Sequence, residues 1–228
     1  MYSTVIHQPE YLPWINLFIK MSMCETFIFL DNVQYQRRSY QNRNLVLLNN
    51  SSKLLTVPLE YAAQETLISD IKIDNSQKWI NSHISVIKNC YQKTRYFEEV
   101  FELIEIEYKK KFIFLNDLNK SLILAIAKKL KIKCKFLSAT DMSVEGKKSD
   151  LILNICKKLN TKKYITGIGS KSYLDIKKFS MNNIETIFLK PINFKYSQVN
   201  NEKSFVPNLS IIDFLFNQGF DKFKDITN

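Results

Sequence analysis

The chain has 228 residues, 45% of them hydrophobic, and its 33 basic and 22 acidic residues give a formal net charge of +11. This length can bury a substantial core, and no apolar run approaches the roughly 18–20 residues of a membrane span. Residues 1–10 lack the basic start and long apolar centre of a signal peptide, so we expect a cytoplasmic protein.

The basic excess invites a nucleic-acid interpretation, but its composition favours a solvated surface. Only four of the 33 basic residues are arginines, and the lysines are spread along predicted helices in a chain rich in Asn and Ile. Such an excess of Lys, Asn and Ile is typical of an AT-rich coding sequence. A site for polyanions stays open as the alternative.

The cysteines predict neither a zinc site nor a disulfide framework. Cys24, Cys90, Cys134 and Cys156 are far apart and show no CxxC spacing. We expect them to be buried as small apolar side chains in a reducing compartment.

The first 31 residues predict a βαβ unit. Residues 2–6 form a short buried strand, and Pro9 and Pro13 exclude regular structure until about residue 13. Residues 14–24 carry apolar side chains at helical spacing, and the β-prone run 26–30 ends in Asp31. A right-handed crossover makes the two strands parallel.

The middle of the chain predicts a hairpin followed by helices. Residues 45–48 and 54–59 resemble two short strands around an Asn/Ser turn at 49–52. Apolar residues at helical spacing then predict three helices, at 79–92, 96–109 and 117–130.

Strand–helix alternation returns in the last part of the chain. Strands are predicted at 134–137, 164–166 and 185–189, and helices at 149–159, 174–181 and 210–217. This alternation at both ends predicts an α/β fold with a mostly parallel, Rossmann-like sheet and a helical middle segment. We expect a single domain, residues 1–228, with a helical insertion at about residues 76–131.

Residues with special backbone or charge behaviour concentrate in three short loops. Gly167 and Gly169 are two of the four glycines, three of the four arginines lie between Arg37 and Arg43, and His7 is one of two histidines. Each loop follows a predicted strand or a strand-containing unit. Because ligands of parallel sheets bind beyond the carboxyl ends of the strands, the three loops are predicted to form one site.

Two residues of this site are predicted to be catalytic. His7 has the pKa range of a general base, with a histidine that holds the turn through hydrogen bonds as the alternative. Asp31, at the end of an apolar strand, could position an amine or a metal-bound phosphate, with a helix or turn cap as the alternative. Because no second acidic residue lies nearby in sequence, we expect no metal site.

A polar, donor-rich set of side chains suits a diphosphate and its nucleoside. For Tyr11 and His83 the alternative is a structural role, for the arginine loop it is a solvated loop, and for the glycine loop it is a turn that needs positive φ. The predicted substrate-binding residues are Gln8, Tyr11, Gln34, Arg38, Gln41, Asn42, Arg43, His83, Gly167, Gly169, Ser170 and Tyr173.

These same stretches carry a family likeness. Residues 7–14 (HQPEYLPW) are followed by Lys20, and residues 29–35 (FLDNVQY) by residues 38–43 (RSYQNR). Trp79 with His83, the glycine loop and residues 205–217 (FVPNLSIIDFLFN) complete the pattern. In this combination the sequence resembles the WbqC-like family from about residue 3 to residue 219. The family is associated with bacterial surface-polysaccharide and O-antigen gene clusters, so the resemblance implies a transferase that makes or decorates sugars.

The first functional hypothesis is therefore acyl or aminoacyl transfer to the amine of a nucleotide-linked amino sugar. His7 would remove the amine proton, Asp31 would position the amine, and the arginines would hold the diphosphate. The donor stays open among coenzyme A, an acyl carrier, an adenylate and a charged tRNA, and the sequence identifies no cofactor or oligomeric state. The alternatives are a nucleotidyl- or phosphoryl-transferring enzyme of similar fold, and a non-enzymatic protein that binds nucleic acid or a glycan-assembly complex.

Overall fold

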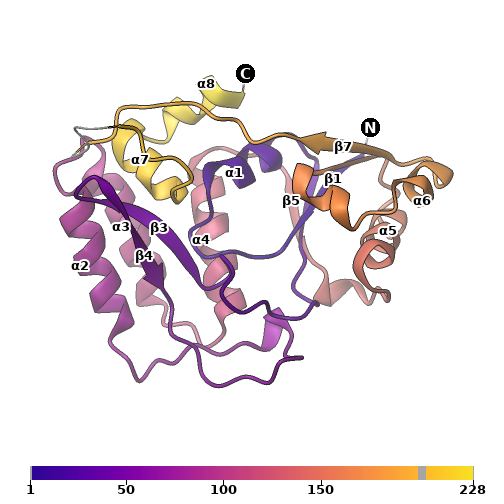
Figure 1. Ribbon diagram of the computed structural model, residues 1–228, viewed down its shortest axis with the longest axis horizontal. Helices are drawn as coiled ribbons and strands as arrows, with labels where there is room; N and C mark the ends of the chain where they lie inside the picture. Colours follow the sequence, from indigo (N-terminus) through magenta and orange to yellow (C-terminus); the bar gives the residue numbers. More distant parts are fainter. Residues whose placement is uncertain (1, 200–203, 228) are drawn as a thin grey trace. The chain divides into compact units, whose positions relative to one another are not determined.

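A computed structural model describes residues 2–199 and 204–227 (Figure 1). The chain forms two compact units, each built from three segments. Unit 1 comprises Met1–Gln8, Asn16–Asn32 and Ile132–Ile192, and unit 2 comprises Pro9–Ile15, Val33–Lys131 and Asn193–Asn228. The predicted helical insertion at 76–131 lies wholly within unit 2, together with the hairpin and the C-terminal helices.

Unit 1 holds a five-stranded sheet in the order β5-β2-β1-β6-β7. Every pairing in it is parallel, so the predicted parallel, Rossmann-like sheet is confirmed. Its strands are β1 (Ser3–His7), β2 (Thr26–Phe29), β5 (Lys135–Ser138), β6 (Lys163–Gly167) and β7 (Glu185–Leu189).

The central strands β1 and β2 are buried on both of their faces. Consecutive residues Val5 and Ile6 of β1 are at most 5% exposed, and Phe27 and Ile28 of β2 are fully buried. A run of apolar residues without alternation is typical of such covered parallel strands. The connecting helices are α1 (Ile15–Ser22), α5 (Lys148–Lys158) and α6 (Ile176–Met181), with short 3₁₀ turns η2 (Thr140–Met142) and η3 (Ile168–Ser172).

Unit 2 begins with the predicted hairpin, β3 (Arg43–Leu48) and β4 (Ser51–Thr56). Its turn is shorter than the expected 49–52, because Asn49 and Asn50 both take positive φ, 49° and 62°. Two such residues make the tight turn that matches strand twist, so Ser51 and Ser52 already belong to β4.

All the helices of unit 2 except the last, short one, which was not predicted, follow the predicted periodicity closely. They are α2 (Trp79–Tyr91), α3 (Phe97–Lys109), α4 (Leu115–Lys129), α7 (Ile211–Gln218) and α8 (Lys224–Thr227), with 3₁₀ turns η1 (Ile68–Asp70) and η4 (Asp221–Phe223). Leu115, Leu122 and Ile126 of α4 are fully buried. No helix in the described part of the chain combines the length and the apolar character that crossing a bilayer requires.

The fully buried carboxylate of Asp213 accepts hydrogen bonds that hold together the C-terminal part of unit 2. Asp213 of α7 accepts hydrogen bonds from Tyr91 Oη at 2.9 Å, Tyr196 Oη at 2.6 Å and Gln198 Nε2 at 2.9 Å. Burial raises the pKa of Asp213 above its ordinary value, and the three donors oppose that shift. The carboxylate thus joins α2, α7 and the segment around residue 197.

Candidate functional site

The carboxyl edge of the unit 1 sheet collects the predicted catalytic residues. His7 ends β1, Gly167 ends β6, and Asp31 lies two residues beyond β2. From β1 the chain goes to β2 on one side, whereas β6 pairs on the other side. The gap between β1 and β6 is therefore the point where strand order reverses, which is where open α/β sheets bind their ligands.

His7 is held as one neutral tautomer. Its Nδ1 lies 2.9 Å from the carbonyl oxygen of Gln8. A carbonyl only accepts, so Nδ1 carries the hydrogen and Nε2 keeps the lone pair. Burial, and then the charge of Lys20, lower the pKa of His7 to about 3. The ring is therefore uncharged at physiological pH and presents a proton-accepting nitrogen.

Lys20 of α1 is a charged group close to His7, and 8% of its surface is exposed. Replacing Lys20 with methionine is expected to raise the pKa of His7 towards 6.5, because the apolar stem stays while the nearby positive charge is lost. An NMR titration of the His7 imidazole measures this pKa. The control is Lys163→Met, which removes a lysine from the amino end of β6 and should leave the His7 pKa unchanged. An unchanged pKa in Lys20→Met would mean that burial alone lowers it.

Asp31 is 1% exposed and caps a turn of the same unit. Its Oδ1 accepts hydrogen bonds from the backbone N–H of Thr140 at 2.9 Å and from Thr140 Oγ1 at 2.8 Å. This joins the end of β2 to the start of η2, the capping role given as the alternative. The positioning of an amine by this carboxylate stays a prediction.

The glycine loop leaves open space beside the carboxyl end of β6. Positive φ is not the reason for its glycines, because neither Gly167 nor Gly169 has it. A Cβ added at either position would meet nothing within 4 Å. Ser170 is buried and donates from Oγ to the carbonyl oxygen of Gly167 at 2.8 Å, whereas Tyr173 is half exposed.

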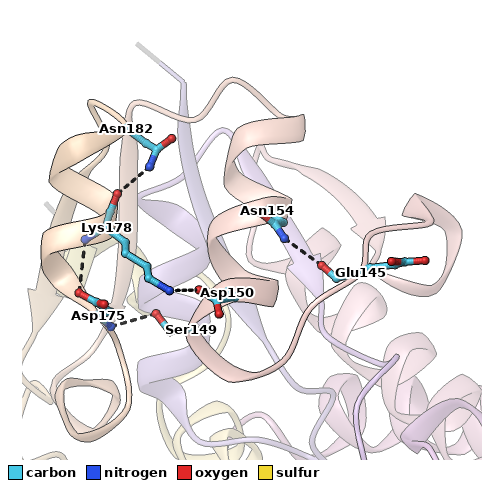
Figure 2. Close-up of polar contacts among 7 residues, drawn as sticks. All are labelled: Glu145, Ser149, Asp150, Asn154, Asp175, Lys178 and Asn182. Atoms are coloured by element: carbon cyan, nitrogen blue, oxygen red, sulfur yellow. Dashed lines mark hydrogen bonds and ion pairs between the residues drawn. The ribbon is translucent and has the colours of Figure 1, made fainter.

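A set of polar contacts fixes the segment that follows this loop (Figure 2). Ser149 Oγ accepts from the backbone N–H of Asp175 at 2.9 Å, and the Asp175 carboxylate in turn caps α6 through the N–H of Lys178. Lys178 Nζ reaches Asp150 of α5 at 2.6 Å. The start of α6 is thereby tied to the first turn of α5.

Gln8, which follows His7, belongs to unit 1, and its role in substrate binding stays a prediction. The remaining predicted substrate-binding residues lie in unit 2, where most of them have protein partners. Gln34 Nε2 donates to the carbonyl oxygen of Gln64 at 2.6 Å, and Asn42 Nδ2 donates to that of Val57 at 2.9 Å. Gln41 is buried and accepts from a backbone N–H at 3.1 Å. Arg38 is exposed with φ of 60°, and Arg43 is half-buried at the start of β3. Diphosphate binding by these arginines stays a prediction.

Tyr11 and His83 bind each other within the core of unit 2. Tyr11 is fully buried, and its hydroxyl lies 2.8 Å from His83 Nδ1 and also contacts Tyr108 Oη. His83 Nε2 lies 3.2 Å from the carbonyl oxygen of Thr56. Nε2 must therefore donate, and Nδ1 must accept from Tyr11. Both ring nitrogens of His83 are used inside the protein, as the structural alternative requires.

This arrangement predicts loss of stability in acid. Burial lowers the pKa of His83 from 6.5 to about 4, so between these values the unfolded chain binds more protons than the folded one. The free energy of unfolding therefore increases by roughly 3 kcal/mol as the pH rises through this window, and it decreases by the same amount as the pH falls. Urea denaturation at several pH values should give a shallower slope for His83→Gln than for the parent chain. Equal slopes would contradict the conclusion that His83 is buried in its neutral form in the folded chain.

A sequence model of the WbqC-like protein family matches residues 8–225. The chain belongs to the WbqC-like protein family. The match begins directly after His7 and includes Asp31 and the glycine loop. The uncharacterized protein Rv1507c of Mycobacterium tuberculosis is 27% identical over 222 residues, which cover 96% of this chain and 95% of that protein. No solved structure matches the chain.

In this WbqC-like chain, two residues near the site had no role assigned from sequence. Lys20 lies beside the apolar stripe of its helix. This position was the signal in the sequence that its side chain is buried. Thr140, the partner of Asp31, is 109 residues away in sequence. Nothing in the sequence around Thr140 indicates that contact.

Proposed function

We propose that this WbqC-like protein is a transferase of bacterial surface-polysaccharide sugar biosynthesis. It acylates or aminoacylates the amine of a nucleotide-linked amino sugar, and His7 is its general base. The observation that carries the proposal is the neutral His7 imidazole at the carboxyl end of β1, with Nδ1 donating to Gln8 and Nε2 left as the proton acceptor.

The tautomer of His7 suits removal of a proton from an attacking amine. The amine nitrogen of the sugar attacks the acyl carbonyl carbon, a C–N bond forms, and the bond from carbon to the donor's leaving group breaks. The nitrogen loses its proton to His7 Nε2, and the leaving group takes up a proton as it departs. A pKa of about 3 makes His7 a weak base in the free protein, and an anionic substrate nearby would raise that pKa.

The surroundings of His7 support an anionic sugar nucleotide as the substrate. The buried positive charge of Lys20 acts on His7, so an anion close to both would be favoured. Because glycine has no side chain, Gly167 and Gly169 leave room beyond β6. The partners we propose are a nucleotide-linked amino sugar and an acyl or aminoacyl donor, for which coenzyme A, an acyl carrier, an adenylate and a charged tRNA are the candidates.

Mass spectrometry of reaction mixtures tests the proposal. The protein is incubated with nucleoside diphosphate amino sugars and, in turn, with acyl-coenzyme A, acyl adenylate or aminoacyl-tRNA. The expected product is the sugar nucleotide carrying one added acyl group on nitrogen. Magnesium-dependent release of phosphate or pyrophosphate would favour the nucleotidyl- or phosphoryl-transfer alternative. Steeply salt-dependent binding of polyanions without any turnover would favour the non-enzymatic one.

A further inference from the structure

Four lysines gather at the amino ends of the strands in unit 1, at the sheet edge opposite His7. Lys135 begins β5, Lys133 lies two residues before it, and Lys162 immediately precedes β6. Lys157 lies in the last turn of α5, the helix that leads into β6. All four residues are exposed, and we call them the edge lysines.

The strand register places three of the edge lysines on one face of the sheet. Paired residues of neighbouring strands point to the same face, and so do alternate residues along a strand. The register joins Lys135 to Thr4 through β2, and it joins Thr4 to Tyr164. Because Lys133 and Lys162 lie two residues before Lys135 and Tyr164, both belong to this face.

Helix α5 covers the same face and brings the fourth lysine to it. The ring of Tyr164 stacks on Phe179 of α6, with ring centroids 5.5 Å apart, so α6 lies on this face. The crossovers from β5 to β6 and from β6 to β7 run in the same direction along the sheet. Since parallel crossovers are right-handed, α5 and α6 lie on the same side. The last turn of α5 therefore places Lys157 beside the other edge lysines.

Two glutamates of this sheet edge lie on its other face. Glu25 is one residue before the row that contains Lys135, and Glu185 pairs in register with Lys163, one residue after Lys162. Lys163 and Glu185 form an ion pair there at 3.9 Å. Among the residues that the structure describes, none of the edge lysines has an ion-pair partner. Their face is left with uncompensated positive charge.

An exposed aromatic ring lies among these charges. Tyr2 is 65% exposed, and its carbonyl oxygen accepts hydrogen bonds from Lys162 N at 2.8 Å and from Lys163 N at 3.1 Å. Tyr2 lies two residues before Thr4 and so belongs to the face of the edge lysines. With strands about 4.8 Å apart, its backbone is about 5 Å from that of Lys162 and about 10 Å from that of Lys133.

We propose that this face of the amino edge binds single-stranded nucleic acid, with the edge lysines on its phosphates and Tyr2 stacked on a base. Proteins that hold single strands combine a positively charged track with aromatic side chains on which bases stack. The ring favours a nucleic acid over an anionic lipid surface, because a base offers a π-face and a lipid headgroup does not. The surface lies opposite His7, so the inference does not depend on the proposed function.

Fluorescence anisotropy tests the proposal with a labelled oligouridine strand and an oligothymidine strand of equal length. About four phosphate contacts predict a slope of roughly −3 for log K against log salt concentration, so the affinity should fall about 50-fold between about 50 and 200 mM salt. Binding of either strand supports the proposal, and the tighter one identifies the sugar. Tighter binding of a duplex, or binding of anionic lipid vesicles without binding of either strand, would overturn it.

Matched lysine variants separate this surface from the general charge of the chain. Replacing all four edge lysines with glutamine should remove most of the salt-dependent binding. The control carries Lys53→Gln, Lys78→Gln, Lys93→Gln and Lys128→Gln, four exposed lysines of unit 2. It lowers the net charge equally and should bind like the parent chain. Equal losses in the two variants would overturn the proposal. Because all these residues are exposed, both variants should remain folded.

A tyrosine variant tests the stacking contact. Tyr2→Ala should weaken binding by about 5- to 150-fold, the usual effect of losing one stacked base, and should leave the salt slope unchanged. The control is Tyr61→Ala, which removes a ring that is 94% exposed in unit 2 and should bind like the parent chain. Binding by Tyr2→Ala that is as tight as that of Tyr61→Ala would contradict recognition of a single strand at this edge.

Discussion

Replacing His7 with alanine is expected to lower kcat/KM by roughly 10²–10⁴-fold, the usual contribution of a general base. The chain should remain folded, because His7 is only half-buried and its ring makes one hydrogen bond, to the adjacent residue Gln8. Turnover is followed by mass spectrometry of the acylated sugar nucleotide, and folding by circular dichroism. Full activity in a folded His7→Ala variant would remove His7 from the mechanism.

The other histidine provides the matched control for this experiment. His83 is 5% exposed and uses both ring nitrogens within unit 2. We expect His83→Gln to lose stability and, at a temperature where it is folded, to keep kcat and KM. A raised KM in the folded variant would instead support the predicted contact of His83 with substrate.

Replacing Asp213 with alanine is expected to lower the free energy of unfolding by about 3–5 kcal/mol, the cost of breaking a buried polar network by removing one partner. Three donors, from Tyr91, Tyr196 and Gln198, would lose their acceptor inside the protein. For a chain of this length, the corresponding fall in Tm is roughly 6–20 °C. Urea denaturation measures the free energy, and calorimetry measures the Tm.

The control for Asp213 is Asp221→Ala in the same unit. The Asp221 side chain is 88% exposed and lies 3.5 Å from Lys131. An exposed pair of this kind contributes at most about 1 kcal/mol. A loss of stability in Asp213→Ala no larger than in Asp221→Ala would contradict the structural role of the network.

The secondary structure was predictable because local patterns carry it. The run Thr26–Phe29 consists of β-prone residues, and the apolar spacing in α2 and α4 follows helical periodicity. The hairpin turn was placed two residues too long, since asparagine's tolerance of positive φ makes a two-residue turn possible. The order of strands in the sheet, with β1 at the centre, has no local signal.

The candidate site was predictable only in part, because its contacts join distant parts of the chain. Sequence placed His7, Asp31 and Gly167 after strands, and the parallel sheet puts them at one edge. It could not show that Asp31 binds Thr140, since that depends on β2 pairing with β5. The glycines illustrate a second limit, because their scarcity marked the loop, whereas the positive φ given as the alternative explanation is not found at Gly167 or Gly169.

Asp213 illustrates how a buried charge can be overlooked. It lies in the apolar run Ile211–Phe216, where a single acidic residue is a signal of burial with partners. Its donors come from α2 and from the segment before α7, up to 122 residues away. Only the packing of unit 2 shows which residues they are.

We propose that a nucleotide-linked amino sugar binds beyond β1 and β6 with its amine at His7. A crystal structure of the protein with nucleoside diphosphate amino sugars tests it most directly. We expect the sugar amine within hydrogen-bond distance of His7 Nε2, with the ligand next to Gly167 and Gly169. A ligand bound away from the carboxyl ends of β1 and β6, or oriented with its amine away from His7, would contradict it.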